Sequence, residues 1–156
     1  MRLVFWVAFW TFLVDQITKY LVVHWMRLAT VQSIDVWPPY LNFRMAWNYG
    51  INFGLFSQQA DLTRWALVAV ALVISGAVLW WVHKDGEHPA AKVSAGLLVG
   101  GALGNVVDRV LYGGVADFLN MSCCGINNPY AFNVADIAVF AGALGLVVFT
   151  SSKKAA

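Results

Sequence analysis

Four stretches of the chain are predominantly apolar, at roughly residues 3–23, 62–82, 92–111 and 131–150. A helix needs about 20 mostly apolar residues to cross a hydrocarbon core of about 30 Å. The pattern therefore predicts four transmembrane helices. The second stretch is the clearest, because no charged residue lies between Trp65 and Val82.

The segment between the first two stretches, residues 24–61, has a different pattern. Apolar residues alternate with polar ones from Leu41 onward, which is typical of β-strands with one apolar face. Gly50 and Gly54 interrupt the alternation and predict a bend or hairpin. We expect a small β-rich platform at the membrane surface, with a plain interfacial loop as the alternative. The apolar positions are Leu41, Phe43, Met45, Trp47, Tyr49, Ile51, Phe53 and Leu55, and the polar ones are Asn42, Arg44, Asn48 and Asn52.

The composition agrees with a membrane protein. Hydrophobic residues make up 60% of the 156 residues and charged residues only 12%, whereas soluble domains carry about 25% charged residues. We therefore expect one membrane domain over residues 1–156. The net charge of +2 gives no basic field for nucleic acid. The adjacent Cys123 and Cys124 provide neither a disulfide framework nor a four-ligand zinc site.

The basic residues predict the orientation. An even number of spans places both termini on one side of the membrane. Short segments rich in Lys and Arg favour the cytoplasm, and the termini and the short loop before the third stretch carry Arg2, Lys84, Lys92, Lys153 and Lys154. We therefore expect both termini in the cytoplasm.

Gly96, Gly100 and Gly104 form a series at every fourth position of the third stretch. In a membrane, such a row of small residues allows a neighbouring helix to approach closely. We expect these glycines to serve helix packing.

Charged residues within apolar stretches require an explanation, because a charge at the bilayer centre is costly. With a rise of about 1.5 Å per residue, Asp15, Asp108 and Asp136 lie roughly 6–12 Å below the same membrane boundary. Asp117 follows the third stretch by a few residues and reaches that level. The four acids are therefore expected in one layer, near the periplasmic face in the predicted orientation.

Helical spacing groups the polar residues of this layer. Asp15 precedes Lys19 by four residues, the favourable order for an ion pair. Because Asp15 has Lys19 and Asp108 has Arg109 as a basic neighbour, we expect structural ion pairs at both acids. Residues on shared helix faces are Asn105, Asp108 and Arg109 in the third stretch, and Asn133 and Asp136 in the fourth.

Asp117 and Asp136 have no basic neighbour in the sequence. Two carboxyl groups close together cannot both ionise cheaply, so one keeps its proton while the other acts as a base. Such a pair can activate water and protonate a leaving amine, as in aspartic proteases. Spacing alone leaves open a small proton-relay transporter and a non-catalytic membrane adaptor.

Five motifs resemble those of the lipoprotein signal peptidase (signal peptidase II) family, the bacterial inner-membrane aspartic peptidases. Together they extend from the first to the fourth apolar stretch. In order they are Asp15-Gln16-Ile17-Thr18-Lys19, Asn48-Tyr49-Gly50-Ile51-Asn52-Phe53, Gly104-Asn105-Val106-Val107-Asp108-Arg109, Val115-Ala116-Asp117-Phe118 and Phe132-Asn133-Val134-Ala135-Asp136. In that family, small residues are common at the positions that Ile51 and Asn52 occupy in this chain.

The resemblance implies an all-α integral membrane protein with four transmembrane helices, a small periplasmic β-cradle and an interfacial segment. It implies cleavage of diacylglyceryl-modified prolipoproteins before the lipidated cysteine, with Asp117 and Asp136 as the catalytic pair. No metal or organic cofactor is expected, and membrane lipids surround what we expect to be a monomer. The supporting positions implied by the motifs are Asp15, Lys19, Asn48, Gly50, Asn105, Asp108, Arg109 and Asn133.

Overall fold

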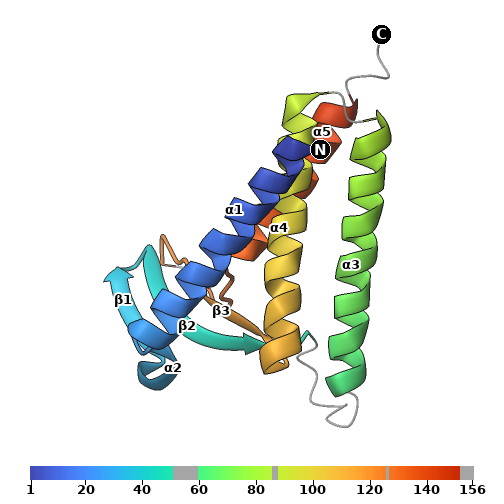
Figure 1. Ribbon diagram of the computed structural model, residues 1–156. Helices are drawn as coiled ribbons and strands as arrows, with labels where there is room; N and C mark the ends of the chain where they lie inside the picture. Colours follow the sequence, from blue (N-terminus) through green and yellow to red (C-terminus); the bar gives the residue numbers. More distant parts are fainter. Residues whose placement is uncertain (51–59, 86–87, 126, 152–156) are drawn as a thin grey trace.

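The computed structural model describes residues 1–50, 60–85, 88–125 and 127–151. Helices dominate it, and a three-stranded antiparallel sheet of order β1-β2-β3 lies beside α1 (Figure 1). A π-helical segment, Tyr20–Trp25, continues α1. The elements are α1 (Arg2–Lys19), α2 (Leu28–Val31), β1 (Ser33–Trp37), β2 (Leu41–Asn48), α3 (Ala60–Asp85), α4 (Pro89–Tyr112), β3 (Val115–Asn120) and α5 (Val134–Ser151).

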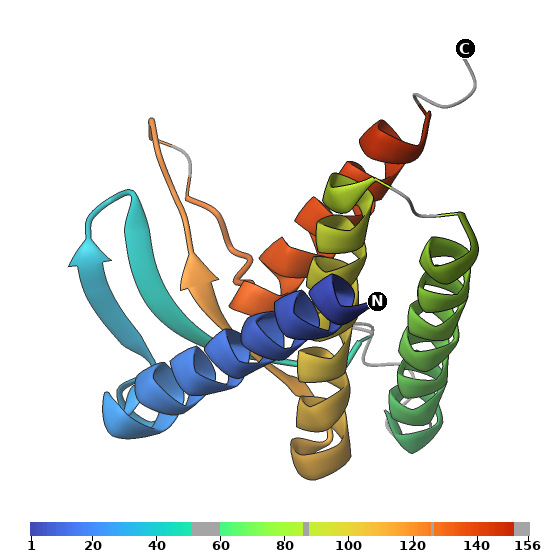
Figure 2. The ribbon, with the colours of Figure 1, turned by 45° about the horizontal axis from the view of Figure 1, so that its top comes forward.

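Helix α4 is the centre of the bundle, with α1 and α5 packed against it and α3 standing farther out (Figure 2). The predicted glycine row faces α1. A Cβ atom on Gly100 would lie 2.5 Å from Ala8 O and 2.8 Å from Thr11 Cβ, closer than real Cβ atoms approach. Gly101 faces the α5 backbone at Ala135. The prediction of close helix packing at these glycines is confirmed.

The helix limits differ from the predicted ones at several ends. Asn133 caps α5, so this helix begins at Val134 rather than at residue 131. Within the described residues, two helices are long and apolar enough to cross a membrane, Asp61–Lys84 and Pro89–Tyr112, and Val134–Phe149 is a shorter apolar helix. The count of four spans therefore stays a prediction.

The predicted alternation is confirmed from Phe43 to Ala46, whereas Trp47 and Asn48 at the end of β2 are both exposed. Phe43 and Met45 point to an apolar cluster that also contains Leu28 and Phe118. Arg44 and Ala46 are exposed on the other face. After β2, Gly50 adopts a φ of +94° and donates its N–H to Asn48 Oδ1, which forms the predicted bend. The predicted positions Ile51, Asn52, Phe53, Gly54 and Leu55 lie outside the described residues.

Strand β3 was not expected, because its sequence lacks period-two alternation. It contains a bulge, since the N–H groups of Phe118 and Leu119 both donate to Phe132 O. Phe118 and Leu119 therefore share the apolar face. Asp117 lies opposite Ala46, on the polar face of the sheet. The side chain of Asp117 is thus held by a strand rather than by a loop after α4.

Candidate active site

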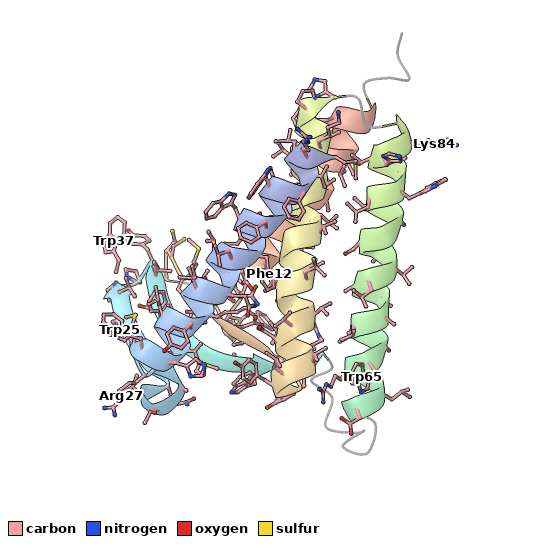
Figure 3. The ribbon with its side chains drawn as sticks, viewed as in Figure 1. Phe12, Trp25, Arg27, Trp37, Trp65 and Lys84 are labelled. Carbon is pink, nitrogen blue, oxygen red and sulfur yellow. The ribbon has the colours of Figure 1, made fainter. Side chains whose placement is uncertain are left out.

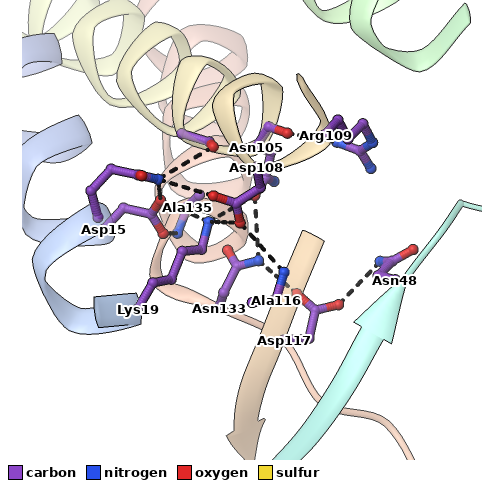
Figure 4. Close-up of polar contacts among 12 residues, drawn as sticks. Asp15, Lys19, Asn48, Asn105, Asp108, Arg109, Ala116, Asp117, Asn133 and Ala135 are labelled. Carbon is purple, nitrogen blue, oxygen red and sulfur yellow. Dashed lines mark hydrogen bonds and ion pairs between the residues drawn. The ribbon is translucent and has the colours of Figure 1, made fainter. Parts of the chain in front are cut away.

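The centre of the polar layer is Lys19, at the end of α1. Its Nζ lies 2.8 Å from Asp15 Oδ2 and 2.8 Å from Asp108 Oδ2 (Figure 4). All three side chains are buried. The ion pair predicted within α1 is confirmed, but the one predicted between Asp108 and Arg109 is wrong. Neighbouring residues on a helix do not face each other, and Asp108 reaches across to α1.

Each of these two carboxylates also holds the backbone beside one of the unpaired acids. Asp15 Oδ1 accepts the Ala135 N–H at 2.9 Å, and Ala135 precedes Asp136. Asp108 Oδ2 accepts the Ala116 N–H at 3.4 Å, and Ala116 precedes Asp117. The ion pair therefore fixes α5 and β3 at the positions from which the candidate catalytic acids project.

Sequence reasoning missed the role of these two alanines. The available signal was the tripeptide Val-Ala-Asp, which occurs at 115–117 and again at 134–136. It also missed Gln16, whose Nε2 donates to Asp15 Oδ2 at 3.1 Å and to Asp108 Oδ1 at 3.2 Å.

Asp136 lies in the first turn of α5, where Asn133 is the N-cap. Asn133 Oδ1 accepts the Asp136 N–H at 2.9 Å, and Asp136 Oδ2 accepts the Asn133 N–H at 3.1 Å. This reciprocal pair is a capping box. Asn105 Nδ2 adds a hydrogen bond of 2.9 Å to Asp136 Oδ1. These hydrogen bonds fix the position of the Asp136 carboxyl group at the start of α5.

Asp117 is buried on β3 and accepts two amide hydrogen bonds. Asn133 Nδ2 donates to its Oδ1 at 2.6 Å, and Asn48 Nδ2 donates to its Oδ2 at 3.1 Å. Burial and, next in size, the nearby Asp136 carboxylate raise the pKa of Asp117 to about 6, although the amide donors act in the opposite direction. Asp117 therefore holds its proton at a much higher pH than an ordinary aspartate.

Asn133 is the residue that joins the two acids. Its side-chain amide binds Asp117, and its backbone N–H and side-chain oxygen bind Asp136. Asp117 lies on β3 and Asp136 on α5, and both bind the same residue, Asn133. Asn105 connects this pair to the ion pair, because its Oδ1 accepts a hydrogen bond of 3.3 Å from Lys19 Nζ.

Arg109 contacts this network at the backbone of Asn105 (Figure 4). Its Nη1 donates to Asn105 O at 3.4 Å, and within the described residues it forms no ion pair with an acid. Gly50 contributes indirectly, through the bend that orients Asn48. Supporting roles for these two residues stay predictions.

The arrangement brings the carboxyl groups of Asp117 and Asp136 into one hydrogen-bonded cluster. In the part of the chain that the structure describes, no three His, Cys, Asp or Glu side chains are placed to hold a metal ion. Asp15 and Asp108, which face each other, share the ammonium group of Lys19. Cys123 and Cys124 are exposed free thiols.

Known proteins are similar to this chain in sequence and in fold. Residues 7–152 match the family described as signal peptidase (SPase) II. The chain is 41% identical over 140 residues to the lipoprotein signal peptidase of Methylobacterium sp. (strain 4-46). The aligned region covers 90% of this chain and 83% of that protein. Identity to the lipoprotein signal peptidase of Alteromonas mediterranea is 38% over 144 residues, or 92% of this chain and 77% of that one.

The fold also matches a solved structure. A bacterial membrane enzyme, determined by the in meso method at 1.9 Å resolution, superimposes with a TM-score of 0.81 and 28% identity. The match covers 96% of this chain and 93% of that chain. Since both the sequence matches and the structural match extend over most of the chain, this protein belongs to the signal peptidase II family.

Proposed function

We propose that this protein removes signal peptides from diacylglyceryl-modified prolipoproteins, by cleaving the peptide bond before the lipidated cysteine. Asp117 and Asp136 are the catalytic pair. The observation that carries the proposal is the hydrogen bonding of both acids to Asn133. Relatives named lipoprotein signal peptidase support the substrate class.

In the proposed mechanism Asp136 is the base and Asp117 the acid. Asp136 takes a proton from a water molecule, whose oxygen bonds to the carbonyl carbon before the cysteine. Protonated Asp117 donates a hydrogen bond to the carbonyl oxygen as negative charge develops there. The carbon–nitrogen bond then breaks, and a proton passes from the pair to the leaving amine. Asn48, Asn105 and Asn133 hold both carboxyl groups in place.

The membrane setting suits this substrate. In the proposed topology four helices span the bacterial inner membrane, both termini are cytoplasmic, and the catalytic pair lies near the periplasmic face. The acyl chains of the substrate would then hold the cleavage site at the depth of the two acids. Water is scarce at this depth, so preorganised donors matter more than they would in solution.

The test is cleavage of a lipidated prolipoprotein by the purified protein in detergent. We expect Asp117→Asn and Asp136→Asn each to lower kcat by at least about a hundredfold, the contribution typical of one general acid or base. Asp61→Asn is the matched control, because Asp61 is highly exposed and lies at the start of α3. Thermal unfolding shows whether each variant is folded.

Two outcomes would contradict the proposal. Cleavage that survives in a folded Asp117→Asn or Asp136→Asn variant would place the chemistry elsewhere. Proton-coupled flux in sealed vesicles without peptide cleavage would favour the transporter alternative.

A further inference from the structure

A second polar pocket lies on the sheet, separate from the cluster of acids. Its volume is about 230 Å³, and it opens on the face of β2 that points away from the apolar cluster. Side chains of all three strands and of the loop after β3 line it. Those that matter here are Ser33, Asp35, Asn42, Arg44, Asn120 and Asn128.

The polar face of β2 connects this pocket to the candidate active site. Asn42 and Arg44 are alternate residues of β2 and share a face, and Asn48 lies further along the same strand, beyond the register shift between Phe43 and Ala46. Asn48 donates to Asp117 Oδ2, whereas Asn42 and Arg44 line the pocket. Asn120 is three residues beyond Asp117 on β3, a distance of about 10 Å along the strand.

The wall of the pocket on the side of β3 is fixed. Asn120 is only 3% exposed. Its Nδ2 donates to Asn128 O at 2.7 Å and to Tyr130 O at 2.8 Å, which holds the following loop against the sheet. The pocket is therefore formed before any ligand enters.

The pocket also offers unused polar groups. Asn42 Oδ1 is shielded from solvent and has no hydrogen-bond partner, and a buried acceptor of this kind is normally satisfied. Asp35 and Arg44 are exposed, and neither takes part in an ion pair within the described residues. One anion and one cation, Asp35 and Arg44, thus line the same small space.

We propose that this pocket binds the polar peptide segment that follows the lipidated cysteine. The proposal rests on the proposed function, which places the scissile bond at Asp117 and Asp136. An extended chain advances about 3.3 Å per residue, so about three residues cover the distance from Asp117 to Asn120. Charged side chains of the substrate pair with Asp35 or Arg44, which line the pocket.

A charge-matching experiment tests this assignment. Three lipidated substrates are compared. The first carries Asp at the third and fourth positions counted from the cysteine, and the second carries Lys at the same two positions. The third is truncated and ends in an amide after the second position. Arg44→Gln is expected to raise the KM for the Asp substrate about two- to fivefold, the effect of one exposed charge pair. Asp35→Asn is expected to do the same for the Lys substrate.

The other measurements serve as controls. The kcat values and the KM of the truncated substrate are expected to stay unchanged in both variants. Lys84→Gln and Asp61→Asn are matched controls, because both side chains are exposed and lie on α3. They are expected to behave like the parent protein with all three substrates.

Three results would overturn the pocket assignment while leaving the proposed function intact. The first is an unchanged KM in both pocket variants. The second is an equal rise for full and truncated substrates, which indicates a structural effect. The third is an effect that depends on added zwitterionic phospholipid rather than on the substrate, which indicates a headgroup site. If the parent protein cleaves none of the lipidated substrates, the proposed function itself fails.

Discussion

Four aspartates of the polar layer differ in the partners that surround them. Asp15 and Asp108 share the ammonium group of Lys19, and each accepts a backbone N–H group. Asp117 and Asp136 receive only amide and backbone donors in the described residues. The same side chain therefore serves as a structural anchor in one pair and as a candidate acid or base in the other.

The raised pKa of Asp117 predicts a pH-dependent activity. If protonated Asp117 is the acid, kcat/KM of the free enzyme falls as the pH rises through about 6. A pH profile of kcat/KM with a short lipidated substrate measures this decrease. A profile that stays flat from pH 5 to about pH 9 would argue against an acid with this pKa.

The same group affects stability. Its pKa is about 6 in the folded protein against an ordinary value of 3.8, so the folded state binds more protons between these values. The free energy of unfolding therefore decreases as the pH rises from about 4 to 6, by at most about 3 kcal/mol. Thermal unfolding should show a weaker pH dependence for Asp117→Asn. An equal dependence in both proteins would contradict the prediction.

Removal of the Lys19 charge should destabilise the protein strongly. Lys19→Met leaves Asp15 and Asp108 buried without their cation, and loss of one partner of a buried ion pair costs about 3–5 kcal/mol. Thermal unfolding in detergent measures the loss, with Lys84→Met as the exposed control. A Lys19→Met protein as stable as the parent would show that the two carboxylates do not need this cation.

At the scale of elements, the site depends on how closely α1, α4 and α5 approach one another. Asp15 on α1 reaches the α5 backbone at Ala135 past Gly104, where any added Cβ would contact the Asp15 carboxylate. Asp108 on α4 reaches the start of β3 at Ala116. Small residues along α4 thus set the distances on which the hydrogen bonds depend.

Two glycine variants test this role of α4. Gly100→Ala introduces a Cβ against the α1 backbone at Ala8 and should lower stability by about 1–3 kcal/mol. Gly76→Ala is the matched control, because nothing lies within 4 Å of its added Cβ. It should be neutral or stabilising by up to about 1 kcal/mol. Equal unfolding temperatures for both variants would show that the α1–α4 contact tolerates a methyl group.

At the scale of the whole molecule, the two ends of the bundle differ in their side chains. Figure 3 shows Lys84 at the end that carries both termini, whereas Trp25, Arg27 and Trp37 lie on the side of the sheet. Trp and Tyr side chains are common at membrane interfaces. Because such residues occur at both interfaces of a membrane, the orientation of the sheet and of the termini stays a prediction.

Thiol labelling tests the orientation. Cys123 and Cys124 are exposed, and the sequence contains no other cysteine. A membrane-impermeant maleimide should therefore label intact spheroplasts at the loop after β3. In a variant that carries Cys123→Ser, Cys124→Ser and Lys84→Cys, labelling should require permeabilised membranes. The reverse pattern would invert the proposed topology.

The sequence by itself determined those features that depend on local periodicity. Runs of apolar residues predicted the helices, the spacing of glycines predicted a packing face, and alternation predicted β2. Counting residues along each helix predicted that the acids lie at one depth in the membrane. These patterns are local, because each helix or strand repeats its geometry from one residue to the next.

Only the tertiary structure decided which groups meet across elements. Lys19 pairs with Asp108 rather than leaving it to Arg109, β3 forms because β2 and Phe132 supply its hydrogen bonds, and Asn133 joins two acids that are distant in sequence. The polar pocket on the sheet likewise combines strands and a loop. These contacts depend on the relative positions of packed elements, which no local repeat in the chain encodes.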